Sequence, residues 1–160
     1  MNVLLVSSSS ELSRHVLSAL AGPDVLTHTE VRSPLRALAL LDDDEGETFD
    51  VVLADNDTQP TGGFYLSREL KARARMGRDV PPVILILARE QDEYLARWSE
   101  ADVWIIKPVD PFDLAEAVEA VAARRPVPQL PGVFTYAERG AIGGPGKAEE
   151  LPPPAPVDGL

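Results

Sequence analysis

Two ionisable side chains that end apolar runs carry the chemistry this sequence suggests. Asp55 closes the run FDVVLAD, and Lys107 closes the run DVWIIK. If both runs are strands of one parallel sheet, both side chains lie at its carboxyl edge, where ligand sites form. The simplest outcome is a stabilising ion pair, because structural pairs also occur in clefts. The stretch LLVSSSSEL places Ser7 to Ser10 at the same edge, and these residues offer hydroxyls without charge.

The elements that position these residues are predicted from hydrophobic periodicity. Apolar runs of strand length, namely NVLLVS, DVLTHTEV, FDVVLAD, PPVILILA and DVWIIK, alternate with segments of helical period. Helix starts are indicated by Ser10 as a cap, by Ser33–Pro34, near Gly63, near Gln91 and by Asp110–Pro111. Five strands and five helices in strict alternation predict an α/β fold: a flavodoxin-like (βα)5 doubly wound parallel sheet.

Composition changes near residue 126 and divides the chain in two. Residues 126–160 hold eight of the fifteen prolines and six of the eleven glycines, without sustained periodicity. We therefore predict a folded domain over 1–125 and a flexible, disordered Pro/Gly-rich tail over 126–160. The apolar cluster from Val133 to Tyr136 is the one part of this tail that could dock on the domain or on a partner.

Charge and residue usage exclude several classes of function. The net charge of −11 argues against wrapping a nucleic-acid backbone. The absence of cysteine excludes thiolate sites, and two isolated histidines, His15 and His28, do not suggest a metal site. Neither a signal peptide nor a membrane-spanning run is present, so we expect a cytoplasmic protein without membrane contact. One basic group is interpreted as a solvated helix face: Arg68, Lys71, Arg73, Arg75 and Arg78.

Three motifs over residues 1–125 resemble the receiver domains of two-component response regulators. DVVLADNDTQPTGG is similar to the third strand of that family, which implies that Asp55 is the phosphoacceptor position. PVILILA is similar to the fourth strand and puts Leu87 where receivers carry Thr or Ser. DVWIIKP is similar to the fifth strand, which implies an aromatic switch position at Trp104, the family lysine at Lys107 and a candidate cis proline at Pro108.

The sequence departs from this family at the positions that would bind metal and phosphoryl group. Receivers carry an acidic pair after the first strand that holds Mg²⁺. Here it falls on Ser7 and Ser8 when counted from the strand end, or on Ser8 and Ser9 when counted from Arg14. Leu87 lacks the usual hydroxyl, and the stretch from Leu87 to Trp104 is about two residues short. The chain therefore resembles an atypical, pseudo-receiver.

These departures define our main functional hypothesis. Without the acidic pair, Asp55 and Lys107 are neutral together and are expected to pair directly, so Mg²⁺ binding is weak or absent and no other cofactor is expected. We expect a stand-alone pseudo-receiver in or derived from phosphorelay signalling, not an enzyme, that acts by protein–protein interaction. Phosphorylation of Asp55 is expected to be impaired or unnecessary. The tail shows no DNA-binding pattern, so direct DNA binding is not expected.

Two alternative functions are also compatible with the sequence. In the first, the chain is a phosphorylatable receiver in which Asp57 or Glu11 substitutes for the lost Mg²⁺ ligands. A turn residue such as Asp57 more commonly faces solvent. In the second, the chain is a small-ligand binder whose serine loop cradles an anion at a helix N-terminus. That loop lacks glycine, and Glu11 would oppose an anion there.

The resemblance implies a protein partner: a histidine kinase, another regulator or an output protein. It also allows a homodimer through the face of the fourth helix, fifth strand and fifth helix. Leu95, Trp98, Trp104 and Ile105 are the apolar residues near that face. We interpret Leu95 and Ile105 as core and Trp98 as the better contact residue, because Trp is enriched in binding hot spots.

Overall fold

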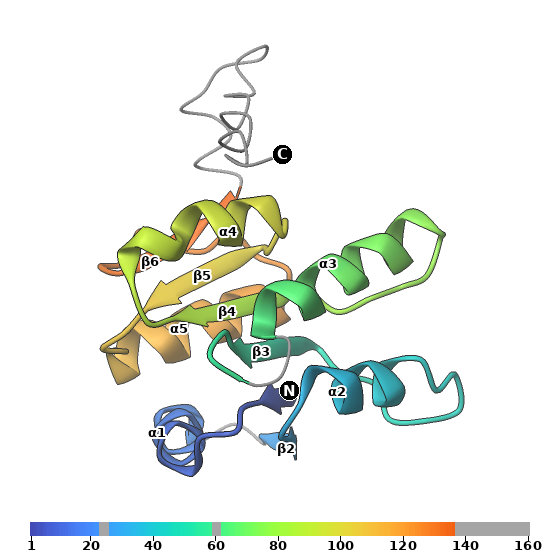
Figure 1. Ribbon diagram of the computed structural model, residues 1–160. Coiled ribbons are helices and arrows are strands. Elements are labelled where there is room, and N and C mark those ends of the chain that lie inside the picture. The colour runs from blue at the N-terminus through green and yellow to red at the C-terminus, as the bar shows by residue number, and fades with distance from the viewer. Residues whose placement is uncertain (23–25, 59–61, 137–160) are drawn as a thin grey trace, which may run out of the picture.

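The computed structural model describes residues 1–22, 26–58 and 62–136 as a single six-stranded sheet with helices on both faces (Figure 1). The strand order is β2-β1-β3-β4-β5-β6. The strands are β1 (Asn2–Val6), β2 (Thr27–Val31), β3 (Val51–Asp55), β4 (Val83–Leu87), β5 (Val103–Ile106) and β6 (Val133–Thr135). The first five pair in parallel, which confirms the predicted flavodoxin-like α/β fold.

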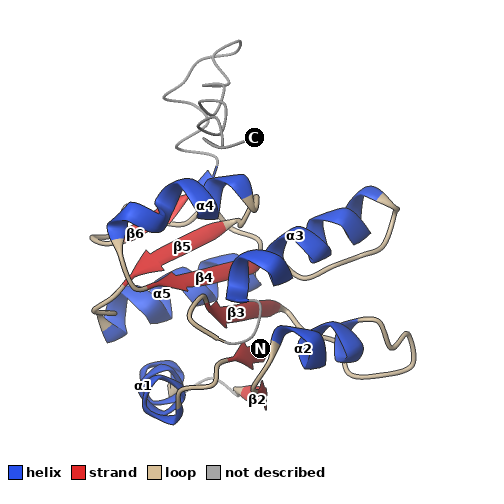
Figure 2. Ribbon diagram, viewed as in Figure 1, coloured by secondary structure: helices blue, strands red, loops and turns tan. Residues whose placement is uncertain are grey.

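The helices connect successive strands and form the two outer layers (Figure 2). They are α1 (Ser10–Leu20), α2 (Pro34–Leu41), α3 (Gly62–Arg75), α4 (Glu93–Trp98) and α5 (Pro111–Ala122), with the short 3-10 helix η1 (Glu90–Asp92) before α4. Helices α1 and α5 cover one face of the sheet, and α2, α3 and α4 cover the other. No helix within the described ranges is long and apolar enough to cross a membrane.

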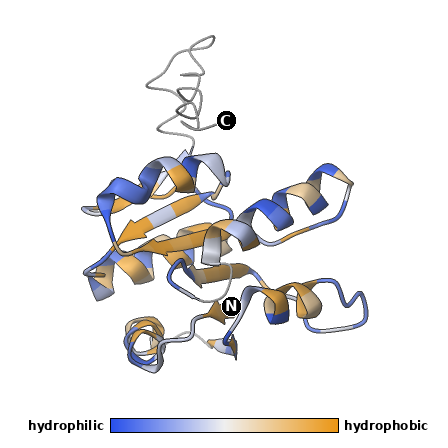
Figure 3. Ribbon diagram, in the orientation of Figure 1, coloured by the Kyte–Doolittle hydropathy of each residue, from blue (hydrophilic) through white to orange (hydrophobic). Residues whose placement is uncertain are grey.

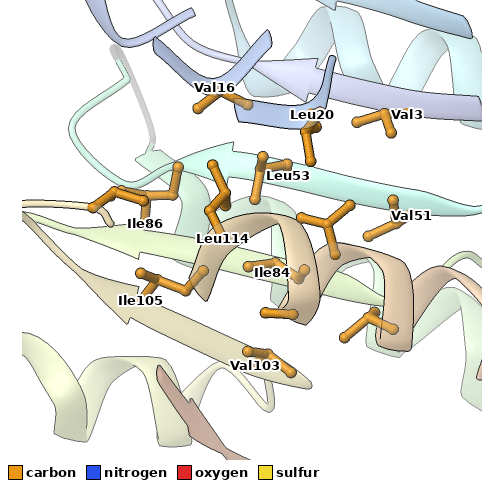
Figure 4. Packing of buried hydrophobic residues seen from close by; sticks show 14 of the residues in the cluster. Val3, Val16, Leu20, Val51, Leu53, Ile84, Ile86, Val103, Ile105 and Leu114 are labelled. Atoms are coloured by element: carbon orange, nitrogen blue, oxygen red, sulfur yellow. The ribbon is translucent and has the colours of Figure 1, made fainter. Parts of the chain in front are cut away.

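Alternate residues of the central strands supply two separate cores. In β4, the odd-numbered side chains of Val83 and Leu85 pack towards α3, and the even-numbered Ile84 and Ile86 pack towards α5. Figure 4 shows the second of these cores, where Leu114 of α5 lies over the central strands. Hydropathy colouring shows the same arrangement, with apolar strands between helices of mixed character (Figure 3). Burial on both faces explains why these strands are almost continuously apolar.

Helix starts follow the capping chemistry in the sequence, with one correction. Ser33 and Asp110 cap α2 and α5, and a proline follows each cap in the first helical position. The cap of α1 is Ser9 rather than the predicted Ser10. Ser9 has an extended backbone, and its hydroxyl accepts a hydrogen bond from the backbone N–H of Leu12 at 3.2 Å, whereas Ser10 is already helical.

The predicted boundary at residue 126 is wrong for the first part of the tail. Val127 and Leu130 pack against the core between the sheet and α5, and residues 133–135 form β6, antiparallel to β5. A three-residue strand is too short to show alternation, and its stability comes from pairing with β5. The remainder of the predicted tail, 137–160, lies outside the described residues.

Candidate functional site

Parallel registration brings the ends of β1, β3 and β5 to one edge of the sheet. Asp55 is opposite Ile86 of β4, and Leu87 is opposite Ile106, the residue before Lys107. Val6, the last residue of β1, is opposite Ala54. The residues that the sequence placed at this edge therefore meet there.

Asp55 is almost fully buried and is held by three groups. One carboxylate oxygen is 3.2 Å from Lys107 Nζ and accepts a hydrogen bond from the backbone N–H of Asp57 at 3.1 Å. The other accepts a hydrogen bond from the Ser7 hydroxyl at 3.3 Å. The Asp55 side chain is 3% exposed, while that of Lys107 is 30% exposed. The two charges thus form a direct ion pair with one buried and one partly hydrated member.

Asp57 does not simply face solvent, as the turn interpretation expected. Its side chain is 58% exposed, yet one carboxylate oxygen lies 3.5 Å from Lys107 Nζ. The ammonium group therefore contacts both carboxylates. Arg89, two residues past β4, is a further cation near Asp57. The hydrogen bond that Arg89 donates to Asp92 raises the pKa of Arg89, and the negative charge of Asp57 raises it further.

The serines of the loop after β1, Ser7 to Ser10, have different roles. Ser7 is buried beside Asp55, and Ser9 caps α1. Ser8 is exposed, and its carbonyl oxygen accepts a hydrogen bond of 2.7 Å from Arg32, the residue after β2. Strand β1 ends at Val6, and of the serines that follow it Ser7 is the one that contacts Asp55.

Sequence reasoning did not identify Arg32 or Arg89. Each follows the end of a strand at this edge, Arg32 directly after β2 and Arg89 two residues after β4. That position after a strand is the signal that could have found both residues.

The residues in the other family positions belong to the core. Leu87 is fully buried among the side chains of the core under α3 and α4. Trp104 is also fully buried and stacks on Phe134 of β6, with ring centroids 6.5 Å apart and planes inclined by 22°. Trp104 therefore does not contribute to an exposed apolar patch.

The loop after β5 lies between the Asp55 pair and α1. The sequence marked Pro108 as a candidate cis proline, and the peptide bond between Lys107 and Pro108 is cis. His15 Nε2 lies 2.9 Å from the carbonyl oxygen of Val109, which ties this loop to α1. Glu11 is exposed and lines a cavity of about 340 Å³ beside Lys107.

The donor set does not fit a receiver-type Mg²⁺ site. Mg²⁺ prefers carboxylate and water oxygens in octahedral geometry. Here the loop after β1 offers serine hydroxyls, and the ammonium of Lys107 contacts the carboxylates of both Asp55 and Asp57. Among the described residues, no group of three or more His, Asp or Glu side chains is arranged to hold a metal ion.

The face implied for a homodimer is partly covered. Strand β6 pairs with β5, so the edge of β5 is not free. Ile105 is buried as predicted and Leu95 is half-buried. Trp98 is 46% exposed, and the guanidinium of Arg68 lies over its ring at 3.9 Å from the centroid.

Sequence comparison finds relatives of one kind. The chain is 28% identical over 121 residues to uncharacterized response regulatory proteins of two Mycobacterium tuberculosis strains, CDC 1551 and H37Rv. The match covers 74% of this chain and 88% of each relative. No family model matches the chain.

Solved structures with the same fold include receiver domains and response regulators. The signal receiver domain of a histidine kinase from Syntrophus aciditrophicus aligns with a TM-score of 0.66 and 23% identity, covering 81% of this chain and 98% of that one. A putative response regulator from Chloroflexus aurantiacus aligns with a TM-score of 0.67 and 17% identity, covering 77% of this chain and 98% of that one. These structural similarities show that the chain has the fold of receiver domains.

Proposed function

We propose that this receiver domain acts in two-component signalling as a protein-binding module whose Asp55 no longer serves as an efficient, Mg²⁺-dependent phosphoacceptor. The observation that carries the proposal is the direct contact of Lys107 with Asp55, beside a serine in place of the family's acidic pair. Output would then depend on the abundance of the protein and of its partner rather than on a phosphoryl group.

The chemistry of phosphoryl transfer explains why this contact matters. Transfer to a carboxylate depends on positioning and on neutralising charge around the transferred group, which receivers achieve with a metal ion. Asp55 is nearly buried, and its oxygens already contact an ammonium, a hydroxyl and a backbone N–H. A phosphodonor would have to displace the ion pair without a metal ion to compensate. Leu87 offers no hydroxyl to hold the product.

Intact-mass analysis tests this proposal directly. The protein is incubated with Mg²⁺ and acetyl phosphate, and the mass is followed for the addition of one phosphoryl group. We expect no modification above that of the Asp55→Asn variant. Modification of the wild-type chain that is lost in Asp55→Asn would overturn the proposal. A variant with Ser7→Asp and Ser8→Asp serves as the positive comparison, because it restores the acidic pair.

A phosphorylatable receiver remains the second candidate because Asp57 leans towards the site. Its carboxylate reaches Lys107 at 3.5 Å, so it could act as a second ligand if Lys107 moved away. The same assay on Asp57→Asn separates the two functions. If the wild-type chain is modified and Asp57→Asn is not, Asp57 supplies the missing ligand. Glu11, which is exposed beside the cavity next to Lys107, is tested in the same way with Glu11→Gln.

A further inference from the structure

The edge of β5 is paired with a segment that follows the fifth helix. Residues 103, 104 and 105 of β5 are opposite Thr135, Phe134 and Val133, in antiparallel register. Hydrogen bonds extend beyond the strand at both ends. Ile106 N–H donates to the carbonyl of Gly132 at 3.1 Å, and Tyr136 N–H donates to the carbonyl of Asp102 at 3.0 Å. A five-stranded sheet would leave these β5 groups free to pair with another chain.

Side chains of this segment pack on both faces of the sheet. Phe134 stacks on Trp104 over one face, and Val133 is 7% exposed in the core on the other. Val127 and Leu130 also pack against that second core. Successive side chains of this segment thus point to opposite faces of the sheet and pack into the cores on both sides, as those of a bound strand do. The segment 127–136 therefore has backbone and side-chain contacts typical of a peptide ligand.

We propose that residues 127–136 are an intramolecular ligand of the β5 edge and close it to a partner strand, including β5 of a second copy of this chain. This inference does not depend on the fate of Asp55. The segment follows Ala122, the last residue of α5, after only a few residues. A tether this short gives an effective concentration on the order of millimolar. A competing strand has to exceed that concentration, or the segment has to detach first.

The covered edge also indicates which strand it accepts. An aromatic side chain is placed next to Trp104, and a β-branched side chain precedes it. A groove of about 550 Å³ beside the segment is lined partly by Glu90, Asp110 and Asp113. The edge is thus suited to a strand that contains an aromatic residue and is flanked by cationic residues. Residues 127–136 supply the aromatic residue but no lysine or arginine.

A cysteine pair tests whether the segment binds within its own chain. The chain has no cysteine, and Val103 and Thr135 are opposite each other, so Val103→Cys with Thr135→Cys introduces one defined pair. Oxidised glutathione accepts the two hydrogens as the disulfide forms. We expect a monomer with a closed disulfide by intact mass and non-reducing electrophoresis. A disulfide-linked dimer or persistent free thiols would contradict the proposal. Val103→Cys alone is the control for adventitious oxidation.

A peptide competition measures the closure itself. A labelled peptide of residues 127–136 is titrated into the wild-type chain, Phe134→Ala and Phe112→Ala. Phe112 is 81% exposed at the start of α5, so its variant matches the loss of a phenyl ring without touching β6. We expect Phe134→Ala to bind the peptide at least about tenfold more tightly than the other two proteins.

A variant peptide and the cysteine-pair protein serve as controls for the competition experiment. The peptide carrying the Phe134→Ala change should bind none of the proteins. The oxidised cysteine-pair protein should not bind the peptide, and reduction should restore only the wild-type level of binding. Equal binding by Phe134→Ala and Phe112→Ala would show that the segment does not close the edge. Circular dichroism checks the fold of Phe134→Ala, and the cysteine pair gives an independent answer if that variant does not fold.

Discussion

The Asp55–Lys107 pair is asymmetric, and this asymmetry decides how each residue responds to substitution. The Asp55 side chain is 3% exposed, whereas that of Lys107 is 30% exposed and also contacts Asp57. If Asp55 loses its charge, Lys107 keeps a carboxylate partner and water. If Lys107 loses its charge, a buried carboxylate is left with one hydroxyl and one N–H. Burying an unpaired charge is the more costly change.

We therefore predict that Lys107→Met destabilises the protein more than Asp55→Asn does. The expected loss is about 2–3 kcal/mol for Lys107→Met and about 1 kcal/mol or less for Asp55→Asn. The double variant should lie close to Asp55→Asn, because it removes the unpaired charge. Urea unfolding at neutral pH measures all three.

A second lysine provides the matched control for this comparison. Lys71 pairs with Asp102, whose side chain is 38% exposed, so Lys71→Met should cost about 1 kcal/mol or less. If Asp55→Asn proved as costly as Lys107→Met, the asymmetry argument would be wrong.

At the scale of elements, the end of β4 and the middle of β5 are part of the core. Leu87 and Trp104 belong to one apolar cluster, and Phe134 of β6 stacks on the indole. In the receiver family the corresponding hydroxyl and aromatic side chain are implied to respond to phosphorylation. Here both side chains are fully buried, so a threonine at position 87 should harm the fold.

We predict that Leu87→Thr costs more stability than Leu87→Val. The valine variant removes one methylene from a fully buried side chain, at about 1 kcal/mol. Threonine has the same shape as valine but adds a hydroxyl, and an unsatisfied hydroxyl costs about 1–3 kcal/mol more. Thermal unfolding of both variants isolates the hydroxyl. Equal stability of the two would mean that the hydroxyl finds a partner at the Asp55 site.

Most of the sheet could be predicted from sequence, because each parallel strand is a buried apolar run between helical segments. Asp55 and Lys107 could be brought together for the same reason, since strand ends share one edge. Strand β6 could not be predicted from sequence, because its three residues carry no periodic signal and depend on pairing with β5 for stability. The inclination of Asp57 towards Lys107 also could not, because a turn residue's side chain direction depends on contacts made after folding.

At the scale of the whole molecule, the basic residues around α3 are engaged with partners within the chain, although Arg68, Arg75 and Arg78 are exposed as a solvated face requires. Arg68 lies over Trp98, and Lys71 pairs with Asp102. The remaining ion pairs are Arg73 with Asp42 and Glu69, Arg75 with Glu100, and Arg78 with Asp44. Together they connect α3 to the loop after α2 and to the end of α4. Their positive charge is neutralised locally on a chain whose net charge is −11.

We therefore predict that the chain does not bind duplex DNA. Binding to phosphates requires cations that can replace the counterions of DNA, and these arginines would first have to leave their carboxylate partners. Fluorescence anisotropy with a labelled duplex, at salt from about 0.01 to 0.1 M, should show no binding. A variant with Asp42→Asn, Asp44→Asn and Glu100→Gln frees Arg75 and Arg78 and leaves Arg73 paired with Glu69 alone, so it reports how much this pairing suppresses DNA binding. Wild-type binding that weakens as salt rises would contradict the prediction, because it would require a phosphate-binding surface that these ion pairs do not leave free.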